Sequence, residues 1–221
     1  MSDIFRIPKP AAGFYKSQCD PAEEVVLEPA FDWARGDENE TFTNALVCSN
    51  CEKLKFYIGE RLIAEVEPDR KTYDHLKYAP FVTNLHAGIG GGWDDLRIEG
   101  YIGGKKVIER KMSAKGVDRQ LLVEPDDRAL IGDGIDMTRV VLKVTDEFGN
   151  VRPFSNAAIE LAVQGPGEIV GEHPFALFGG VGAVWIKTKQ SPGMIRLTAT
   201  HPVLGAKTVT FNVKPFRAPS L

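Results

Sequence analysis

Residues 133–171 read DGIDMTRVVLKVTDEFGNVRPFSNAAIELAVQGPGEIVG, and this stretch decides the fold class. Two runs within it, 140–145 and 159–164, place apolar side chains at every second position, which is the pattern of a half-buried β-strand. Between them, 146–150 contains Gly and Asn, which tolerate the positive φ of tight turns. The Gly-Pro-Gly at 165–167 ends the second run, because proline cannot donate to a strand ladder. The stretch therefore predicts an all-β fold.

The same alternation recurs on both sides of this stretch and predicts two consecutive domains. We expect a short helical stub at 1–20, a β-sandwich at 21–116 and a C-terminal immunoglobulin-like β-sandwich at 117–221. Short strands at regular spacing favour sandwiches over a parallel sheet, and about seven antiparallel strands in about 100 residues are typical of immunoglobulin-like domains. The strands are expected at 25–27, 43–48, 53–58, 62–66, 96–101, 106–111, 120–123, 139–145, 158–163, 182–188, 194–200 and 207–213.

The N-terminal stub differs in composition from the rest of the chain. Pro8 and Pro10 precede two alanines and two aromatic residues, which predicts a short helix with proline near its first turn. Isolated helices below about 12–15 residues are marginal in water. We therefore expect this helix to pack on another part of the protein through Phe5, Phe14 and Tyr15.

Composition argues against two classes of partner. The chain has 221 residues, 43% hydrophobic and 26% charged, with a net charge of −3 and scattered Lys and Arg. A nucleic-acid-binding stripe or a polybasic membrane patch would need clustered basic residues. No apolar run approaches the roughly 20 residues that span a bilayer, and the N-terminus does not resemble an export leader. We expect no nucleic-acid and no membrane partner, and the sequence leaves open a cytoplasmic or an exported location.

The three cysteines, Cys19, Cys48 and Cys51, are too few for a disulfide scaffold. Cys48 and Cys51 have the CxxC spacing of zinc sites and redox helices. A zinc site needs two further ligands, for which His75 and His86 are the nearby candidates, and the redox motif needs a βαβ context that this β-pattern lacks. We therefore predict free, mostly buried thiols.

The residues that could carry catalysis do not form a known pattern. The four histidines are widely spaced, and neither a nucleophile elbow nor a zinc-protease motif is present. The acid pairs 94–95 and 126–127 would point to opposite faces of a strand, so we expect turn and capping roles. Asp133 and Asp136 lack the spacing of an EF-hand, which favours turn acids over a surface calcium ion, and the glycine-rich 88–93 lacks the following helix that a phosphate cradle needs. We predict no catalytic, cofactor-binding or metal-ligating residue, and no cofactor.

One group of residues is a candidate for carbohydrate contact. Trp93 follows the glycine-rich loop, and Tyr78 and His86 lie nearby in sequence. Exposed aromatic side chains can stack on the apolar side of a pyranose ring. The alternative is that Trp93 packs on its own or a neighbouring domain. Trp33 could equally pack against a missing domain, and Trp185 is expected in the core or between domains.

Three segments, taken in order, resemble the C-terminal part of family 2 glycoside hydrolases, the β-galactosidase and β-glucuronidase family. Residues 5–18 resemble the last helix of that family's catalytic barrel. Residues 47–59, with the Ser-Asn-Cys motif, resemble a hairpin of the β domain that follows the barrel. The acids and glycines at 133–136 and the Gly-Pro-Gly at 165–167 resemble the last immunoglobulin-like domain of bacterial members.

The resemblance implies that the chemistry lies outside this chain. In the family, the paired catalytic glutamates lie on barrel strands upstream, and retaining enzymes hold their two carboxyl groups about 5–5.5 Å apart. The chain departs from the family in one turn, where Gly59-Glu60 replaces Asn-Gly. We interpret the chain as a non-catalytic accessory region of a β-galactosidase-like enzyme that hydrolyses β-glycosidic bonds. Its partner would be the upstream catalytic barrel, and its role barrel packing, an active-site wall or a homo-oligomer interface.

Two other functions are compatible with this sequence. The first is an autonomous carbohydrate-binding module, which would depend on Trp93. The second is an adhesin-type tandem of immunoglobulin-like domains, because the second domain also resembles bacterial surface repeats.

Overall fold

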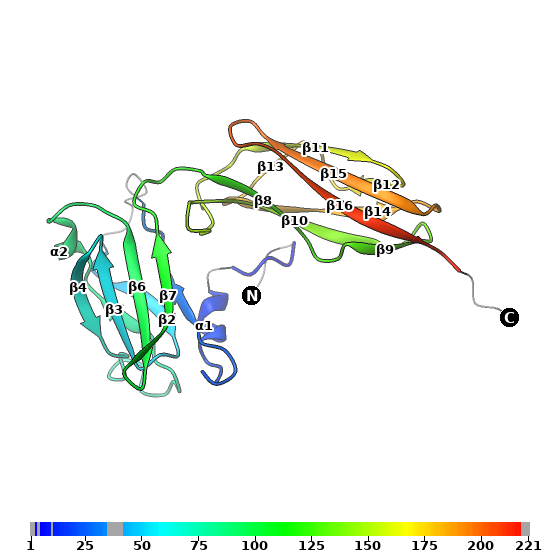
Figure 1. Ribbon diagram of the computed structural model, residues 1–221. Coiled ribbons are helices and arrows are strands. Elements are labelled where there is room, and N and C mark those ends of the chain that lie inside the picture. The colour runs from blue at the N-terminus through cyan, green and yellow to red at the C-terminus, as the bar shows by residue number, and fades with distance from the viewer. Residues whose placement is uncertain (1–2, 4, 10, 35–41, 218–221) are drawn as a thin grey trace. The chain divides into compact units, whose positions relative to one another are not determined.

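The computed structural model describes residues 3, 5–9, 11–34 and 42–217 and divides the chain into two compact units, 1–116 and 117–221 (Figure 1). Each unit consists of β-sheets. Helices contribute little, since α1 (Ala12–Lys16) has five residues and α2 (His86–Ile89) has four. Within the described part of the chain, no helix has the length and apolar character needed to cross a membrane.

The first unit is a sandwich of a three-stranded and a four-stranded sheet. The strand orders are β1-β2-β5 and β4-β3-β6-β7, and every neighbouring pair is antiparallel. The bounds are β1 Leu27–Pro29, β2 Ala45–Ser49, β3 Lys53–Ile58, β4 Arg61–Val66, β5 Phe81–Thr83, β6 Leu96–Ile102 and β7 Lys105–Met112.

Alternation along β3 explains how this sandwich closes. Leu54, Phe56 and Ile58 are buried, while the residues between them stay partly exposed. Their side chains meet those of Val47 and Phe81 from the other sheet in a single apolar cluster. The core of the first unit therefore lies between its two sheets.

The second unit is a sandwich of a four-stranded and a five-stranded sheet. The strand orders are β12-β14-β10-β8 and β13-β11-β15-β16-β9. Strands β9 and β16 are parallel, and the other neighbouring pairs are antiparallel. The bounds are β8 Gln120–Pro125, β9 Ala129–Gly132, β10 Met137–Thr145, β11 Ala158–Gln164, β12 Gly167–Val170, β13 Phe175–Ala176, β14 Val181–Thr188, β15 Gly193–His201 and β16 Gly205–Pro215.

The stretch 133–171 supplies the centre of this second core. Val140, Leu142 and Val144 of β10 are each 0% exposed. The turn after β10 is held by the buried Asp146 carboxylate, which accepts the backbone N–H of Phe148 at 2.9 Å and that of Asn150 at 2.8 Å. The alternating apolar residues thus face the core, and the acid of the turn replaces the missing strand hydrogen bonds.

The structure confirms the predicted fold class, with two β-sandwiches and a short N-terminal helix. It also contains four short strands that the sequence pattern does not indicate, β5, β9, β12 and β13. Strands of two to four residues have too few positions to display alternation. The glycine-rich connection 88–93 contains the end of α2, a helix that the sequence does not predict.

A methyl group at Gly165 tests the close packing of the second unit. Gly165 has φ +95°, and a Cβ there would clash with the Met194 carbonyl oxygen, whereas Gly205 has φ +78° and nothing within 4 Å. We expect Gly205→Ala to lower the free energy of unfolding by about 1–2 kcal/mol, the effect of a positive φ alone. Gly165→Ala should lower it clearly more, as measured by urea denaturation. Equal losses in the two variants would contradict the close approach.

Candidate functional sites

A buried asparagine attaches the incoming chain to the first unit. Asn50 lies in the turn between β2 and β3 and is 2% exposed. Its Oδ1 accepts the backbone N–H of Val26 at 2.8 Å. Its Nδ2 donates to the carbonyl oxygens of Cys19 at 3.2 Å and Glu24 at 2.8 Å. We call these four residues the Asn50 junction, because one amide binds three points of the segment that leads into β1.

Further contacts hold the residues that precede the junction. The Gln18 side chain donates from Nε2 to the carbonyl oxygen of Tyr78 at 2.8 Å and accepts the Tyr78 N–H at 3.4 Å. Helix α1 lies so close to β1 that a Cβ on the buried Gly13 would be 2.7 Å from the Glu28 Cβ. Tyr15 is 64% exposed. Helix α1 therefore approaches β1 through Gly13, while Tyr15, one of the aromatic residues through which we expect the stub to pack, stays exposed.

The CxxC cysteines lie beside the Asn50 junction as buried free thiols, as predicted. Ser49, between them, donates from Oγ to the Val26 carbonyl oxygen at 2.6 Å. Burial raises the pKa of both the Cys48 and the Cys51 thiol, so both stay protonated and weakly reactive. The described residues contain no group of three or more His, Cys, Asp or Glu that could hold a metal ion. This motif is therefore part of the packing around the junction.

Two stacked tryptophans form a second distinctive feature of the first unit. The Trp33 and Trp93 rings have centroids 4.5 Å apart and lie within 7° of parallel. Trp33 is 1% exposed, while Trp93 remains partly exposed. Both indole N–H groups donate to backbone carbonyl oxygens, Trp33 to Asp94 at 2.9 Å and Trp93 to Ala114 at 3.2 Å. Trp33 is therefore a core residue of its own unit.

An arginine holds the glycine-rich loop that precedes Trp93. Arg61 of β4 donates from Nη2 to the carbonyl oxygens of Gly88 at 3.2 Å and Gly92 at 3.0 Å. A Cβ on Gly91 would clash with the same guanidinium group. The glycines thus allow Arg61 to lie against the loop backbone, and its hydrogen bonds order the loop.

The Asn50 junction and the tryptophan stack lie at opposite ends of the first unit. Strand β3 begins at Lys53, three residues after Asn50, and β6 begins at Leu96, three residues after Trp93. The two strands pair antiparallel, so their first residues lie at opposite ends of the sheet.

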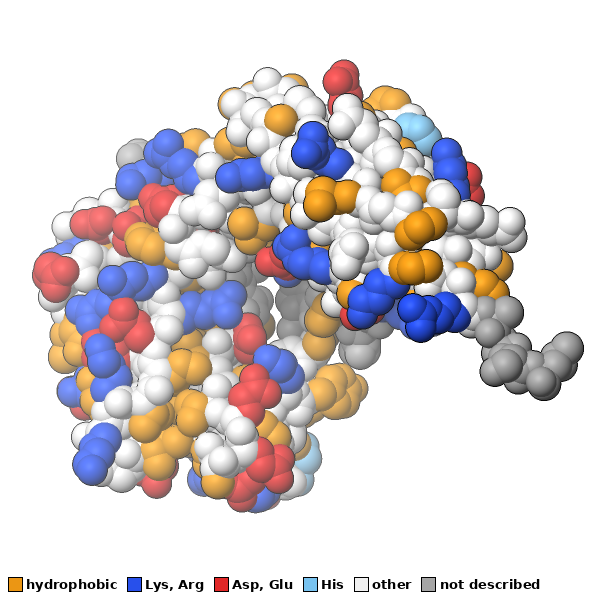
Figure 2. All heavy atoms as spheres, turned by 45° about the vertical axis from the view of Figure 1, so that its right-hand side comes forward, with side chains coloured by type: hydrophobic (Ala, Val, Ile, Leu, Met, Phe, Trp, Pro, Cys, Tyr) orange, Lys and Arg blue, Asp and Glu red, His pale blue; other side chains and the backbone are white. Residues whose placement is uncertain are grey.

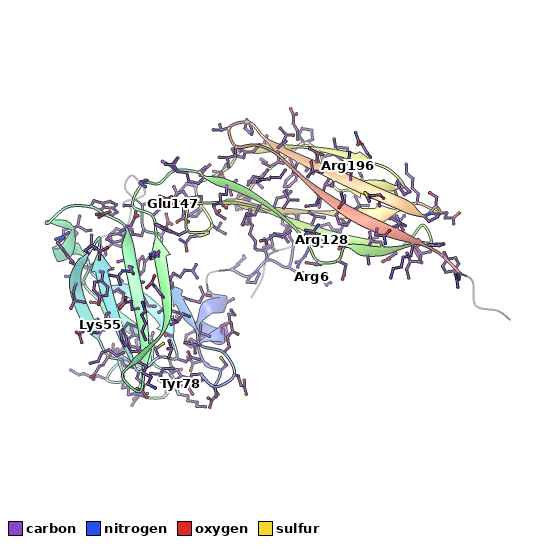
Figure 3. All side chains as sticks on the ribbon, in the orientation of Figure 1. Arg6, Lys55, Tyr78, Arg128, Glu147 and Arg196 are labelled. Atoms are coloured by element: carbon purple, nitrogen blue, oxygen red, sulfur yellow. The ribbon has the colours of Figure 1, made fainter. Side chains whose placement is uncertain are left out.

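This arrangement separates the three residues proposed for carbohydrate contact. Tyr78 is hydrogen-bonded to Gln18 at the junction end, where Figure 3 labels it. His86 is exposed and is the first residue of α2, at the other end of the unit (Figure 1). The structure therefore places His86 at the same end as Trp93 and does not bring Tyr78 to them.

The adjacent acid pairs have separate structural roles. Asp94 Oδ1 accepts the N–H of Asp95 at 2.8 Å, and Asp95 Oδ1 accepts the N–H of Ala114 at 2.9 Å. Asp126 forms a bidentate pair with Arg139, both N–O distances being 3.0 Å. The first pair therefore holds turns, as predicted, while Asp126 is instead the partner of a strand arginine.

The acids at 133–136 also hold a turn. Asp133 Oδ1 accepts the N–H groups of Ile135 at 2.8 Å and Asp136 at 2.7 Å, and these hydrogen bonds lower the pKa of Asp133. Asp136 Oδ2 accepts the N–H of Ile131 at 2.7 Å. Both carboxylates thus have the structural role that the sequence predicts.

A charged network covers the outer face of the four-stranded sheet. Glu99 of β6 is only 5% exposed, accepts the Tyr101 hydroxyl at 2.6 Å and is ion-paired with Arg97 and Lys106. Burial alone raises the pKa of Glu99, but Tyr101, Lys106 and Arg97 outweigh it and hold the pKa below its ordinary value. The same hydrogen bond raises the pKa of Tyr101 to about 12. Figure 2 shows how acidic and basic side chains intermingle on the first unit.

The roles of Asn50 and Arg61 are not visible in the sequence pattern. Asn50 joins groups 24 to 31 residues away, and Arg61 joins groups 27 and 31 residues away. Such long-range contacts leave no periodic signal. In the sequence, Asn50 is distinguished by the Ser-Asn-Cys motif, which resembles a motif of the family.

The chain is similar to known proteins in both sequence and fold. Residues 121–210 match the family model described as glycoside hydrolase family 2 C-terminal domain 5. The chain is 34% identical to a β-galactosidase of Thermoanaerobacter pseudethanolicus, over 96% of this chain and 30% of that protein. It is also 34% identical over 124 residues to a β-galactosidase sequence of Rhizobium radiobacter, covering 90% of that sequence and 56% of this chain.

A region of a solved β-glycosidase of Bacteroides vulgatus has the same fold, with a TM-score of 0.76 at 16% identity over 96% of this chain and 27% of that one. The chain is thus an all-β region of two compact units. A buried asparagine binds the segment that leads into the first unit. The chain belongs to glycoside hydrolase family 2 and corresponds to a C-terminal region of its members. It spans 30% of the length of the Thermoanaerobacter relative.

Removing the Asn50 side chain should destabilise the first unit. Asn50→Ala removes the side-chain acceptor of the Val26 N–H and the amide donor of the Cys19 and Glu24 carbonyl oxygens, of which the Glu24 oxygen keeps only the Cys19 thiol at 3.4 Å. A buried polar group without a partner costs about 1–3 kcal/mol, so we expect the free energy of unfolding to fall by at least about 2 kcal/mol. The exposed Asn44 of the same unit provides the control, and Asn44→Ala should change it by less than about 0.5 kcal/mol. Urea denaturation measures both, and an equally small effect at Asn50 would contradict its role.

The stability supplied by Glu99 should depend on pH. Its folded-state pKa lies below the ordinary value, so its contribution is present above about pH 4.3 and is lost as the pH falls through the folded-state pKa. We expect Glu99→Gln to lower the free energy of unfolding at about pH 7 and to matter less at about pH 3.5. The exposed Glu172 is the control residue, because Glu172→Gln should have no comparable effect at either pH. A loss at Glu99 that stays constant with pH would contradict the network.

Proposed function

We propose that this chain is the non-catalytic C-terminal accessory region of a family 2 glycoside hydrolase, and that a catalytic barrel precedes it in the same polypeptide. The observation that carries the proposal is the Asn50 junction. A segment that leads into a domain needs such a buried attachment when its position relative to the preceding part of the protein matters. We infer that the junction fixes the position of the first β-sandwich relative to the barrel.

The sequence relatives support this proposal. The relative from Thermoanaerobacter is named a β-galactosidase, and the chain covers 30% of it. We therefore propose that the complete protein hydrolyses β-galactosidic bonds and that the residues responsible lie in the preceding part. The roles of the acidic residues in this chain support a non-catalytic function. The carboxylates of Asp95, Asp126, Asp133 and Asp136 all accept structural hydrogen bonds.

The surface of α1 supports packing against the barrel as the main role. Gly13 faces β1, while the aromatic Tyr15 is 64% exposed next to the partly exposed Phe14. The two rings contact each other edge to face, with centroids 5.4 Å apart. A pair of aromatic side chains on the outer side of a short helix is a suitable contact for a preceding domain.

The test compares the 221-residue chain with the polypeptide encoded by the complete gene. Hydrolysis of nitrophenyl β-galactoside should be undetectable with the chain alone and readily measured with the complete protein. In the complete protein, Asn50→Ala should lower the temperature of half-inactivation, whereas Asn44→Ala, at an exposed position of the same unit, should leave it unchanged. Hydrolysis by the chain alone, or a complete protein that lacks a barrel and hydrolyses no β-galactoside, would contradict the proposal.

A further inference from the structure

The geometry of the tryptophan stack leaves one face of Trp93 outside the aromatic cluster. Trp33 covers one face of the Trp93 ring at a centroid distance of 4.5 Å. The Phe42 ring is inclined by 62° to both indoles and lies 4.9 Å from Trp33 and 5.7 Å from Trp93. A ring that is this near to both members of a parallel pair lies beside the stack and cannot cap its outer end. Trp93 is thus partly buried against the core on the side of Trp33 and Phe42, and it stays partly exposed.

Both indoles are held in place before any ligand arrives. The Trp93 N–H donates to the Ala114 carbonyl oxygen at 3.2 Å, and the buried Trp33 donates to that of Asp94 at 2.9 Å. The preceding loop is held by Arg61, through the carbonyl oxygen of Gly92 at 3.0 Å. A side chain that is already ordered loses little conformational freedom on binding, which favours even a weak ligand.

The surroundings of Trp93 combine open space with polar groups. Gly90, Gly91 and Gly92 are all exposed, and nothing lies within 4 Å of the position that a Gly92 Cβ would occupy. The exposed side chains of Asp94 and Arg61 provide a carboxylate acceptor and a guanidinium donor close to the loop. Bare backbone permits the approach of a flat ligand, and a few polar groups at the edge of an apolar surface give it orientation.

We propose that Trp93, supported by Trp33, is a stacking platform for a pyranose ring of a neutral oligosaccharide. A pyranose has an apolar C–H face that can stack on an indole and hydroxyl groups that can bind carboxylate and guanidinium groups. The platform lies at the end of the first unit opposite the Asn50 junction, so the attachment of the preceding chain does not occupy it. The galactosides among the test sugars are chosen because of the proposed function. The proposed stacking of a pyranose ring on Trp93 does not depend on that function.

The test is titration calorimetry of the 221-residue chain with lactose, galactobiose and cellobiose. We expect saturable binding of at least one sugar, weakened about tenfold or more by Trp93→Ala, which is the order of magnitude by which the loss of an aromatic side chain weakens the binding of a stacked nucleobase. Trp185→Phe, a change in the second unit, should leave the affinity unchanged. The absence of saturable binding with all three sugars, or an affinity that Trp93→Ala does not alter, would overturn the proposal.

A second variant separates binding from folding. Trp93→Tyr keeps an aromatic ring in the stack but loses the hydrogen bond to Ala114, so its thermal unfolding temperature should fall below that of the wild type by less than in Trp93→Ala, while its affinity also falls by a smaller factor than in Trp93→Ala. If Trp93→Tyr is stably folded and binds as tightly as the wild type, the indole is not the platform. Hydrolysis by the complete protein is measured separately, so a loss of sugar binding here and a failure of the proposed function give different results.

Discussion

The hydrogen bonds of the Asn50 amide are the constraint on which the first unit depends. The three residues between β2 and β3 bring this one side chain to the segment before β1, where it binds one N–H and two carbonyl oxygens. An irregular segment can be buried only if its backbone groups find partners. A single 2% exposed amide forms three of the hydrogen bonds that fix the path of the chain into the sandwich, and the Ser49 hydroxyl adds one at the Val26 carbonyl oxygen.

The rest of the first unit is organised around that fixed entry. Its core fills the space between two sheets, its outer sheet face is covered by the Glu99 network, and its far end is closed by stacked tryptophans. In the second unit, the incoming segment is held by Asp118, which accepts the hydroxyl of the buried Ser155 at 2.8 Å and is ion-paired with Arg152, and tight turns are held by Asp133 and Asp146. The first unit therefore carries both features that we connect with function, attachment to a preceding domain and a partly exposed aromatic platform.

Local patterns predict the fold well, because alternation along a strand is a property of neighbouring residues. The runs containing Val140 and Ile159 are buried as the sequence indicates, and the acids of the turns have their expected roles. The candidate sites are harder to predict, because they depend on contacts between distant residues. Trp93 is visible in the sequence as an unusual aromatic residue, but its stacking on Trp33 and its separation from Tyr78 follow only from strand register.

Amide hydrogen exchange at Val26 tests the central claim most directly. Its N–H donates to the Asn50 side chain and to no regular strand partner in the described pairing, so its protection reports on the junction alone. We predict slow exchange at Val26 in the wild type and exchange at least about a hundredfold faster in Asn50→Ala, while the amide of Phe56 in the centre of β3 stays protected in both. Fast exchange at Val26 in the wild type, or protection that survives Asn50→Ala, would contradict the account.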